Sequence, residues 1–376
     1  MNSAIPANAR LTTQDSLLQR STRWLARSLV NHDQFGAYFE PLIQMVLPHW
    51  TAQGYRTSVR SIRQENDSVF TLVLQPGKRW PEFQAGQYVE LTVEQNGARM
   101  TRCFSISSTP EQWRRSGTVE LSIRVQDKGR ITPWLREALK AGDWVTLSEA
   151  KGDFILRDAR KPALFIAGGS GITPFRSILG ELAARGSIQD AHLLYYCNGD
   201  THLFKSEWEE LQQRHPGLKV QLIDTLAEGF ISAEQLQRYS PDFAQRDTYL
   251  CGPAPMIQLA QTILREQGVP DSQVFLEYFG PAPVPVDANL AGVVHFGQSG
   301  GQAEATKESP RTLLELAESA GLKPVYGCRL GVCHQCTCPK QSGIVFNRLT
   351  QSYSDSGRED IQLCISVPVG PVVIDL

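Results

Sequence analysis

Three cysteines stand close together in the last fifth of the chain, at Cys328, Cys333 and Cys336. Their spacing is C-x4-C-x2-C, and Cys364 follows after 27 intervening residues. A disulfide framework is typical of a short secreted chain with dispersed cysteines, whereas clustered thiols in a long chain favour metal binding. The sequence therefore predicts a loop that wraps around an inorganic centre, with one ligand supplied from a distant segment.

This spacing is the one found for plant-type 2Fe-2S clusters. Two irons and two sulfides leave four outward positions, so a loop has to place three thiolates while a distant strand supplies the fourth. Gly327 and Gly331 suit such a loop, because a backbone close to the cluster can point N–H groups at its sulfurs. The candidate ligands are Cys328, Cys333, Cys336 and Cys364.

Structural zinc is the alternative for this site. Cys333 and Cys336 would form one pair, and Cys364 or His334 would complete the tetrahedron. Zinc leaves Cys328 without a role and lacks a second close pair, so the spacing favours the 2Fe-2S cluster. The remaining thiols are interpreted as a bystander (Cys338) and as core residues (Cys103 and Cys197).

Length and charge limit the other possibilities. A chain of 376 residues with 41% hydrophobic residues can form several cored domains. Lys and Arg number 37 against 39 Asp and Glu, without a basic block, which argues against a nucleic-acid partner. The sequence shows neither a stretch of 18 apolar residues nor a secretory signal pattern, so we expect a cytoplasmic protein without a transmembrane segment, and a monomer.

Hydrophobic periodicity divides the chain into modules. Helical spacing over 1–50 predicts an N-terminal helical extension of one or two helices, and a period of two over 51–157 predicts an antiparallel β-barrel. Apolar strands alternating with helical patterns over 158–280 predict an α/β doubly wound parallel sheet. The proline-rich stretch 281–290 is expected to be a semi-rigid linker, and a third unit occupies 291–376.

One barrel strand ends in Arg102-Cys103-Phe104-Ser105, which matches the R-x-[YF]-S pattern of the ferredoxin:NADP reductase superfamily. The chain resembles that superfamily over roughly 55–280. The resemblance implies a flavin, FAD in preference to FMN, bound by the barrel. It implies further that Arg102 pairs with the flavin phosphate, that Phe104 packs on the isoalloxazine or ribityl chain, and that Ser105 lies near the flavin N5.

A second phosphate contact is implied by the same resemblance, at a later strand and a glycine turn. Backbone N–H groups at a glycine-led helix start are natural donors to a pyrophosphate. The candidate residues are Ile123, Arg124, Gly129, Ile131 and Thr132.

A glycine-rich turn, Gly168-Gly-Ser-Gly-Ile-Thr-Pro174, joins an apolar strand to a helical stretch. In that context glycines let the backbone approach a nucleotide diphosphate, although a lone turn of this kind can also be a plain connection. It resembles the GGxGITP signature of these reductases, and Cys251-Gly252-Pro253 with Met256 resembles their C-G-P-x-x-M block, where the cysteine lies against the nicotinamide. The candidate contacts are Gly168, Gly169, Gly171, Thr173, Pro174, Cys251, Gly252 and Pro253.

Two further positions bear on the chemistry. Glu277-Tyr278-Phe279 resembles the acidic and aromatic element that borders the flavin in relatives, so Glu277 joins Ser105 and Cys251 as a candidate catalytic residue, with a solvent-facing carboxylate as the alternative. Asn198 stands where NADPH-using relatives commonly carry an arginine for the 2'-phosphate. NADH and NADPH therefore both remain candidate donors.

The modules together predict an electron-transfer enzyme, because a flavin converts the paired electrons of a nicotinamide into the single electrons that a cluster accepts. The resemblance implies a β-grasp ferredoxin fold (α+β) for 291–376. Domain order and the ending Cys364-Ile-Ser-Val-Pro-Val-Gly resemble bacterial oxidoreductases that feed membrane fatty-acid desaturases, so the expected acceptor is a di-iron desaturase. The alternatives are the reductase of a Rieske-type oxygenase, a redox-sensing protein without turnover, and a diaphorase with a vestigial cluster.

Overall fold

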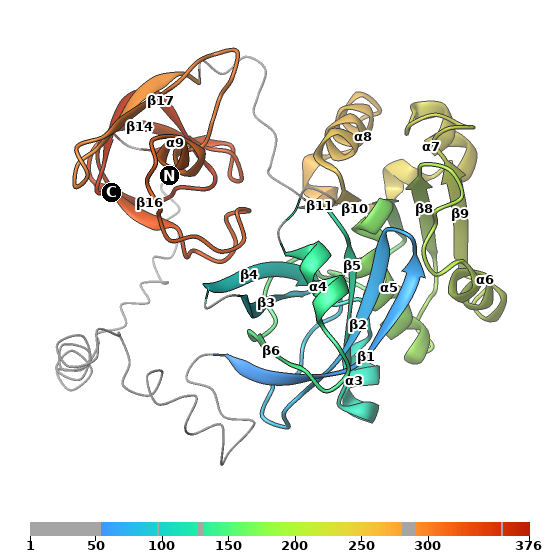
Figure 1. The fold of residues 1–376 in the computed structure, drawn as a ribbon. Coiled ribbons are helices and arrows are strands. Elements are labelled where there is room, and N and C mark those ends of the chain that lie inside the picture. The colour runs from blue at the N-terminus through green and yellow to red at the C-terminus, as the bar shows by residue number, and fades with distance from the viewer. Residues whose placement is uncertain (1–53, 96–97, 127–128, 130, 280–289, 355) are drawn as a thin grey trace, which may run out of the picture. The chain divides into compact units, whose positions relative to one another are not determined.

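The computed structural model describes residues 54–95, 98–126, 129, 131–279, 290–354 and 356–376 (Figure 1). The predicted helical extension over 1–50 lies outside the described residues, and so does the predicted linker except for its last residue. The chain divides into Met1–Arg56 and Thr57–Leu376, and the elements below belong to the second unit apart from the start of the first strand. Over the described ranges, no helix has the length and apolar character needed to span a bilayer.

The first module is an antiparallel barrel. Its order is β4-β3-β6-β1-β2-β5, and the amide of Ser107, just past β4, donates to the carbonyl of Glu120 on β5 at 2.9 Å, which closes the sheet on itself. The predicted antiparallel pairing is confirmed, for example where β2 and β5 pair. Its elements are β1 (Tyr55–Asn66), β2 (Val69–Pro76), β3 (Tyr88–Gln95), β4 (Ala98–Ser105), α3 (Pro110–Ser116), β5 (Val119–Arg124), α4 (Thr132–Ala138) and β6 (Trp144–Leu147).

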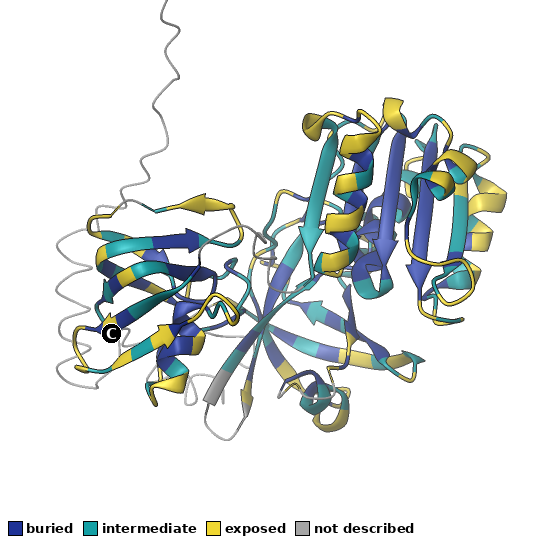
Figure 2. Ribbon diagram, turned by 90° about the horizontal axis from the view of Figure 1, so that it is seen from above, coloured by how far each residue is buried: buried dark blue, intermediate teal, exposed yellow. Residues whose placement is uncertain are grey.

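The second module is a five-stranded parallel sheet in the order β11-β10-β7-β8-β9. One face packs on α5 and α6 through Phe175 and Trp208, and the other on α7 and α8 through Leu236 and Ile257. Figure 2 shows the central strands buried along their length beneath helices with exposed outer faces. The elements are β7 (Ala163–Gly168), α5 (Ile172–Ala184), β8 (Ala191–Cys197), α6 (Lys205–Arg214), β9 (Leu218–Asp224), α7 (Ala233–Tyr239), β10 (Asp247–Gly252), α8 (Ala254–Glu266) and β11 (Val274–Tyr278). Single 3-10 turns lie at η1 (Gly169–Gly171), η2 (Phe243–Gln245) and η3 (Asp271–Gln273).

The predicted doubly wound sheet is confirmed, and its topology places a ligand site. The chain passes from β7 outward to β8 and β9 and then returns to β10 on the other side of β7. Ligands bind at such a switch point, beyond the carboxyl ends of the strands. The glycine turn at the end of β7 lies there.

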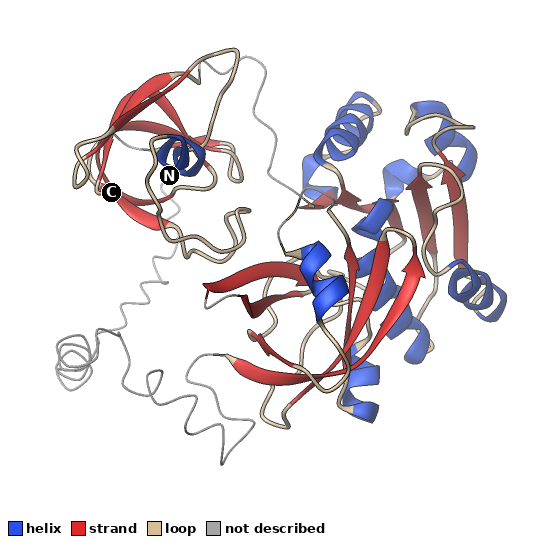
Figure 3. Cartoon of the chain, viewed as in Figure 1, coloured by secondary structure: helices blue, strands red, loops and turns tan. Residues whose placement is uncertain are grey.

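The third module is a mixed sheet with one helix. Its order is β13-β12-β17-β14-β15, in which β12 and β17 run parallel while β16 pairs with β14. Figure 3 shows the strands of this module around its one helix. A capping box of Thr312 and Glu315 starts the helix, whose apolar face enters the core. Leu290, the last residue of the predicted linker, is buried in this module. The elements are β12 (Gly292–Phe296), β13 (Gln302–Ala305), α9 (Leu313–Ser319), β14 (Thr337–Asn347), β15 (Ser352–Tyr353), β16 (Glu359–Gln362) and β17 (Ser366–Ile374).

Candidate functional site

The glycine turn and the cysteine-glycine-proline block are packed against each other. A Cβ atom on Gly171 would lie 2.2 Å from the carbonyl oxygen of Cys251, and one on Gly168 would lie 2.5 Å from the sulfur of Met256. Gly169 has a φ of 53°, in the left-handed region that favours glycine. The two motifs that the sequence singled out separately therefore form one structure at the carboxyl ends of β7 and β10.

A cavity of about 530 Å³ opens beside this turn. The glycine turn, the end of β8, the start of α8 and part of the barrel line it. Arg124 contributes from the end of β5, with Nη1 3.4 Å from the position of a Cβ on Gly169. Arg124 therefore lines the cavity of the glycine turn, and its expected contact with the flavin phosphate stays a prediction.

The three predicted catalytic residues come together from three strands. Cys251 on β10 and Glu277 on β11 are direct partners in the parallel register, and Ser105 ends β4. The Ser105 hydroxyl donates to Glu277 Oε2 at 3.3 Å, and the Cys251 thiol lies 3.9 Å from the same oxygen. Burial raises the pKa of Glu277 from its ordinary 4.5 to about 7. This carboxyl can therefore hold or release a proton near neutrality.

The rest of the flavin motif lies on the same strand. Arg102 and Phe104 are both half-buried on β4, and Arg102 Nη1 donates to the carbonyl of Thr101 at 2.7 Å. Sequence reasoning missed Tyr88, which is the direct partner of Ser105 across β3 and β4. Burial raises the pKa of the Tyr88 hydroxyl, and Glu277 adds to the effect. Strand register would have revealed this neighbour, whereas composition could not.

The remaining nucleotide and flavin candidates lie at or near the ends of strands and helices. Thr132 begins α4. Its hydroxyl accepts a hydrogen bond from the amide of Gln126 at 2.8 Å, which connects the end of the preceding strand region to the start of the helix. Thr173, in the first turn of α5, donates to the carbonyl of Ser170 at 3.0 Å. The other candidates, whose proposed contacts stay predictions, are Ile123, Gly129, Ile131, Pro174, Gly252 and Pro253.

The four clustered cysteines fall into two pairs. The thiol of Cys328 contacts those of Cys103 on β4 and of Cys333, and the thiol of Cys336 contacts that of Cys364. Backbone amides point at the first pair: Leu330 N lies 3.3 Å and Cys333 N 3.4 Å from Cys328 Sγ. Two thiolates for each iron and N–H groups aimed at sulfur fit a 2Fe-2S cluster.

The loop around these thiols depends on its glycines. A Cβ on Gly327 would lie 2.8 Å from Cys333 Sγ, and Gly331 has a φ of 80° with Ile365 2.7 Å from its would-be Cβ. The thiol of Cys338 has a partner outside the group of four, because it donates to the carbonyl of Asp375 at 3.4 Å. Among the described residues, no three or more His, Cys, Asp or Glu side chains are grouped so that they could hold a metal ion.

Family models match each of the three modules. The oxidoreductase FAD-binding domain matches residues 58–155, and the oxidoreductase NAD-binding domain matches 165–262. The 2Fe-2S iron-sulfur cluster binding domain matches residues 297–369.

Relatives extend this likeness over the length of the chain. The NADH oxidoreductase HCR of Escherichia coli (strain K12) is 30% identical over 327 residues, which cover 85% of this chain and 97% of the relative. The chain belongs to the ferredoxin:NADP reductase superfamily. The reductase is also 28% identical to the NADPH oxidoreductase of Mycobacterium tuberculosis (strain H37Rv) over 337 residues, 89% of this chain and 87% of the relative.

Among solved structures, phthalate dioxygenase reductase has the same modular fold. The match has a TM-score of 0.60 at 21% identity and covers 85% of this chain and 97% of that one. The reductase is thus an NAD(P)H-dependent oxidoreductase of the FAD and 2Fe-2S type that transfers electrons.

Proposed function

We propose that this reductase oxidises NADH and delivers single electrons to an oxygen-activating partner protein, with a di-iron fatty-acid desaturase as the first candidate. The observation that carries the proposal is the meeting of Ser105, Cys251 and Glu277, with Cys251 packed against the glycine turn, in a chain that also pairs four thiols. FAD, when bound, supplies the conversion between a hydride and single electrons.

The chain's own residues bind, orient and exchange a proton. The amides of the glycine turn at the start of α5 would hold the nucleotide diphosphate, and Arg124 would neutralise part of its charge. Cys251 and Ser105 would border the nicotinamide and the flavin ring, as the family resemblance implies. Glu277 would hold the proton that accompanies flavin reduction, because its pKa lies close to neutrality.

NADH is the proposed donor because of the charge around the cavity. Of the described residues that line it, Arg124 is the one with a charged side chain, and it faces the glycine turn. At the end of β8, Asn198 lines the cavity, and Asp224 accepts the amide of Gly199 at 2.8 Å. A 2'-phosphate needs an arginine or lysine, whereas a 2'-hydroxyl does not.

The desaturase is proposed from the domain order and from the sequence Cys364-Ile-Ser-Val-Pro-Val-Gly. A Rieske-type oxygenase is the second candidate, because its reductases share this domain order and the fold neighbour is named a dioxygenase reductase. Either acceptor would take one electron at a time from the cluster held by Cys328, Cys333, Cys336 and Cys364.

The test is an anaerobic titration of the purified chain with NADH and, separately, NADPH. Flavin and cluster absorbance are followed together, and the reduced sample is examined for a 2Fe-2S EPR signal. Bleaching of both chromophores with the signal present supports the electron path, and the faster nucleotide is the donor. Bleaching of the flavin alone would refute transfer to the cluster, and no bleaching with either nucleotide would favour a redox sensor.

The acceptor is tested by reconstitution. The reductase with NADH is supplied to membranes that contain a di-iron desaturase and, in parallel, to a Rieske oxygenase component, and product formation is measured in each. Turnover with the oxygenase alone would replace the first candidate by the second.

A further inference from the structure

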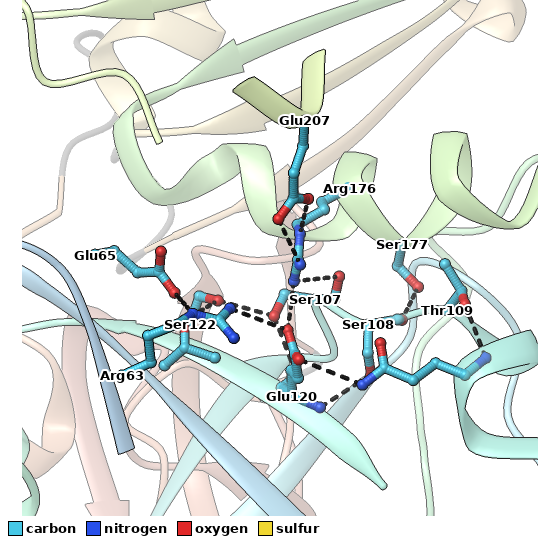
Figure 4. A network of polar contacts seen from close by, with 12 residues as sticks. Arg63, Glu65, Ser107, Ser108, Thr109, Glu120, Ser122, Arg176, Ser177 and Glu207 are labelled. Carbon is cyan, nitrogen blue, oxygen red and sulfur yellow. Dashed lines mark hydrogen bonds and ion pairs between the residues drawn. The ribbon is translucent and has the colours of Figure 1, made fainter. Parts of the chain in front are cut away.

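A partly buried ion-pair network joins the barrel to the first turns of α5 (Figure 4). Arg176 Nη1 contacts Glu120 Oε2 on β5 at 2.7 Å, and its Nε and Nη2 pair with the two oxygens of Glu207 at 2.7 and 2.9 Å. The Arg176 guanidinium also lies 4.3 Å from the ring centroid of Phe204. One arginine thus connects the barrel carboxylate with the start of α6.

Glu120 is an unusual strand residue because its charged side chain is only 9% exposed. Burial alone would raise the pKa of Glu120, but Arg176 and Arg63 hold it below its ordinary value. Gln112 Nε2 donates to its other oxygen at 3.3 Å. An unpaired charge here would be costly, so the network specifies which part of α5 meets the barrel.

A second contact runs beside the first. The buried hydroxyl of Ser177 donates to the carbonyl of Ser108 at 2.6 Å, and the Ser108 hydroxyl accepts the amide of Glu120 at 2.9 Å. Ser108 lies three residues after Ser105, and Ser177 follows Gly171 by six residues. The two contacts therefore connect β5 and the segment just after β4, which carries the flavin motif, with the helix that follows the glycine turn.

We propose that Glu120 and Arg176 are positioning residues for hydride transfer. By fixing α5 on the barrel, they set where the glycine turn holds the nucleotide relative to Ser105, and so the approach of the nicotinamide to the flavin ring. The proposal rests on the reductase activity of the chain. Neither residue touches the reacting atoms, so the expected effect is on the rate of hydride transfer rather than on binding.

The test compares Glu120→Gln and Arg176→Lys with the matched control Glu207→Gln. The control removes a carboxylate from Arg176 but leaves the barrel contact intact. Flavin reduction is followed by rapid mixing over a range of NADH concentrations, which separates the limiting rate from nucleotide affinity. Flavin content and reduction of the cluster by dithionite are measured on the same samples.

We expect the limiting rate to fall about 10- to 100-fold in Glu120→Gln and Arg176→Lys, since a misplacement of about 1 Å can cost about 100-fold. Nucleotide affinity, flavin content and dithionite reduction stay within about 2-fold, and the control stays within about 3-fold. Unchanged limiting rates, or a loss that only follows lost flavin or lost nucleotide affinity, would overturn the proposal. An equal loss in Glu207→Gln would also overturn it.

Hydrogen exchange gives a readout that needs no turnover. In Glu120→Gln, exchange in 105–109 and 172–178 should become faster together, while the ferredoxin module is unchanged; unchanged protection there would refute the contact's role. Should Glu120→Gln fail to fold, Ser177→Ala removes one hydroxyl from the same connection and should slow reduction several-fold with faster exchange in 172–178. If neither nucleotide reduced the flavin of the parent protein, the reductase function would be contradicted. The hydrogen-exchange result would still test whether Glu120 and Arg176 hold α5 on the barrel.

Discussion

Replacing Glu277 by glutamine should remove a pH-dependent loss of stability from the flavin and nucleotide modules. The pKa of the carboxyl is about 7 in the folded protein, against 4.5 ordinarily, because the folded site disfavours the charged form. The folded protein therefore holds this proton more tightly than the unfolded chain does. Its contribution to stability is complete below about pH 4.5 and is lost as the pH rises through about 7.

The magnitude follows from the difference between the two pKa values. A difference of one corresponds to about 1.4 kcal/mol, so the full effect at high pH is about 3 kcal/mol. About 2.5 kcal/mol of it should develop between pH 5 and pH 8.5. The glutamine in Glu277→Gln does not titrate. The free energy of unfolding of the variant, relative to that of the parent, should therefore rise by about 2.5 kcal/mol between pH 5 and pH 8.5.

The assay is urea unfolding of the flavin-free, full-length chain at both pH values, followed by tryptophan fluorescence. All seven tryptophans precede the ferredoxin module, so the signal excludes that module. The exposed Glu209 provides the control, since Glu209→Gln should differ from the parent by the same amount at both pH values. The reasoning would be refuted if the free energies of unfolding of the parent and of Glu277→Gln also differed by the same amount at both pH values.

Three further substitutions test the other parts of the site. Gly171→Ala should cost about 1–3 kcal/mol in the same fluorescence assay and weaken NADH binding, because the new methyl meets the carbonyl of Cys251; Gly77→Ala, where nothing lies within 4 Å, should not. Asn198→Arg should raise kcat/KM for NADPH relative to NADH by about tenfold, and an unchanged ratio in steady-state kinetics would count against the proposed donor. Cys333→Ser should abolish the 2Fe-2S EPR signal and acceptor reduction while NADH still bleaches the flavin; acceptor reduction at the parent rate would mean that the cluster is not on the path.

Local patterns in the sequence were sufficient for the elements that surround the site. The apolar run that became β7 is followed directly by glycines, so both the strand and the start of α5 at Ile172 could be predicted. The cysteine spacing likewise depends on chain geometry within one loop. These features are short-range, and the side chains that define them are close in sequence.

Long-range packing could not be predicted in the same way. Glu120 alternates with apolar neighbours on β5, which is typical of a solvent-facing position, yet Arg176 from another module buries it. The cavity that Arg124 lines has the same origin, because residues of the adjoining module form most of its wall. The fit of Gly171 against Cys251 joins residues 80 positions apart, and no local pattern contains that information.

The order of β17 in its sheet has a consequence for biosynthesis. β17 lies between β12 and β14, and Cys364 precedes it by two residues. Domains fold largely as units and in order of synthesis, so the barrel and the parallel sheet can form while the ribosome is still translating the ferredoxin module. That module lacks both its central strand and its fourth thiolate until β17 is made. The four-thiolate site for iron and sulfide is therefore completed only when the last residues are synthesised, and a chain truncated before Cys364 should keep the flavin and nucleotide modules but lack a complete cluster site.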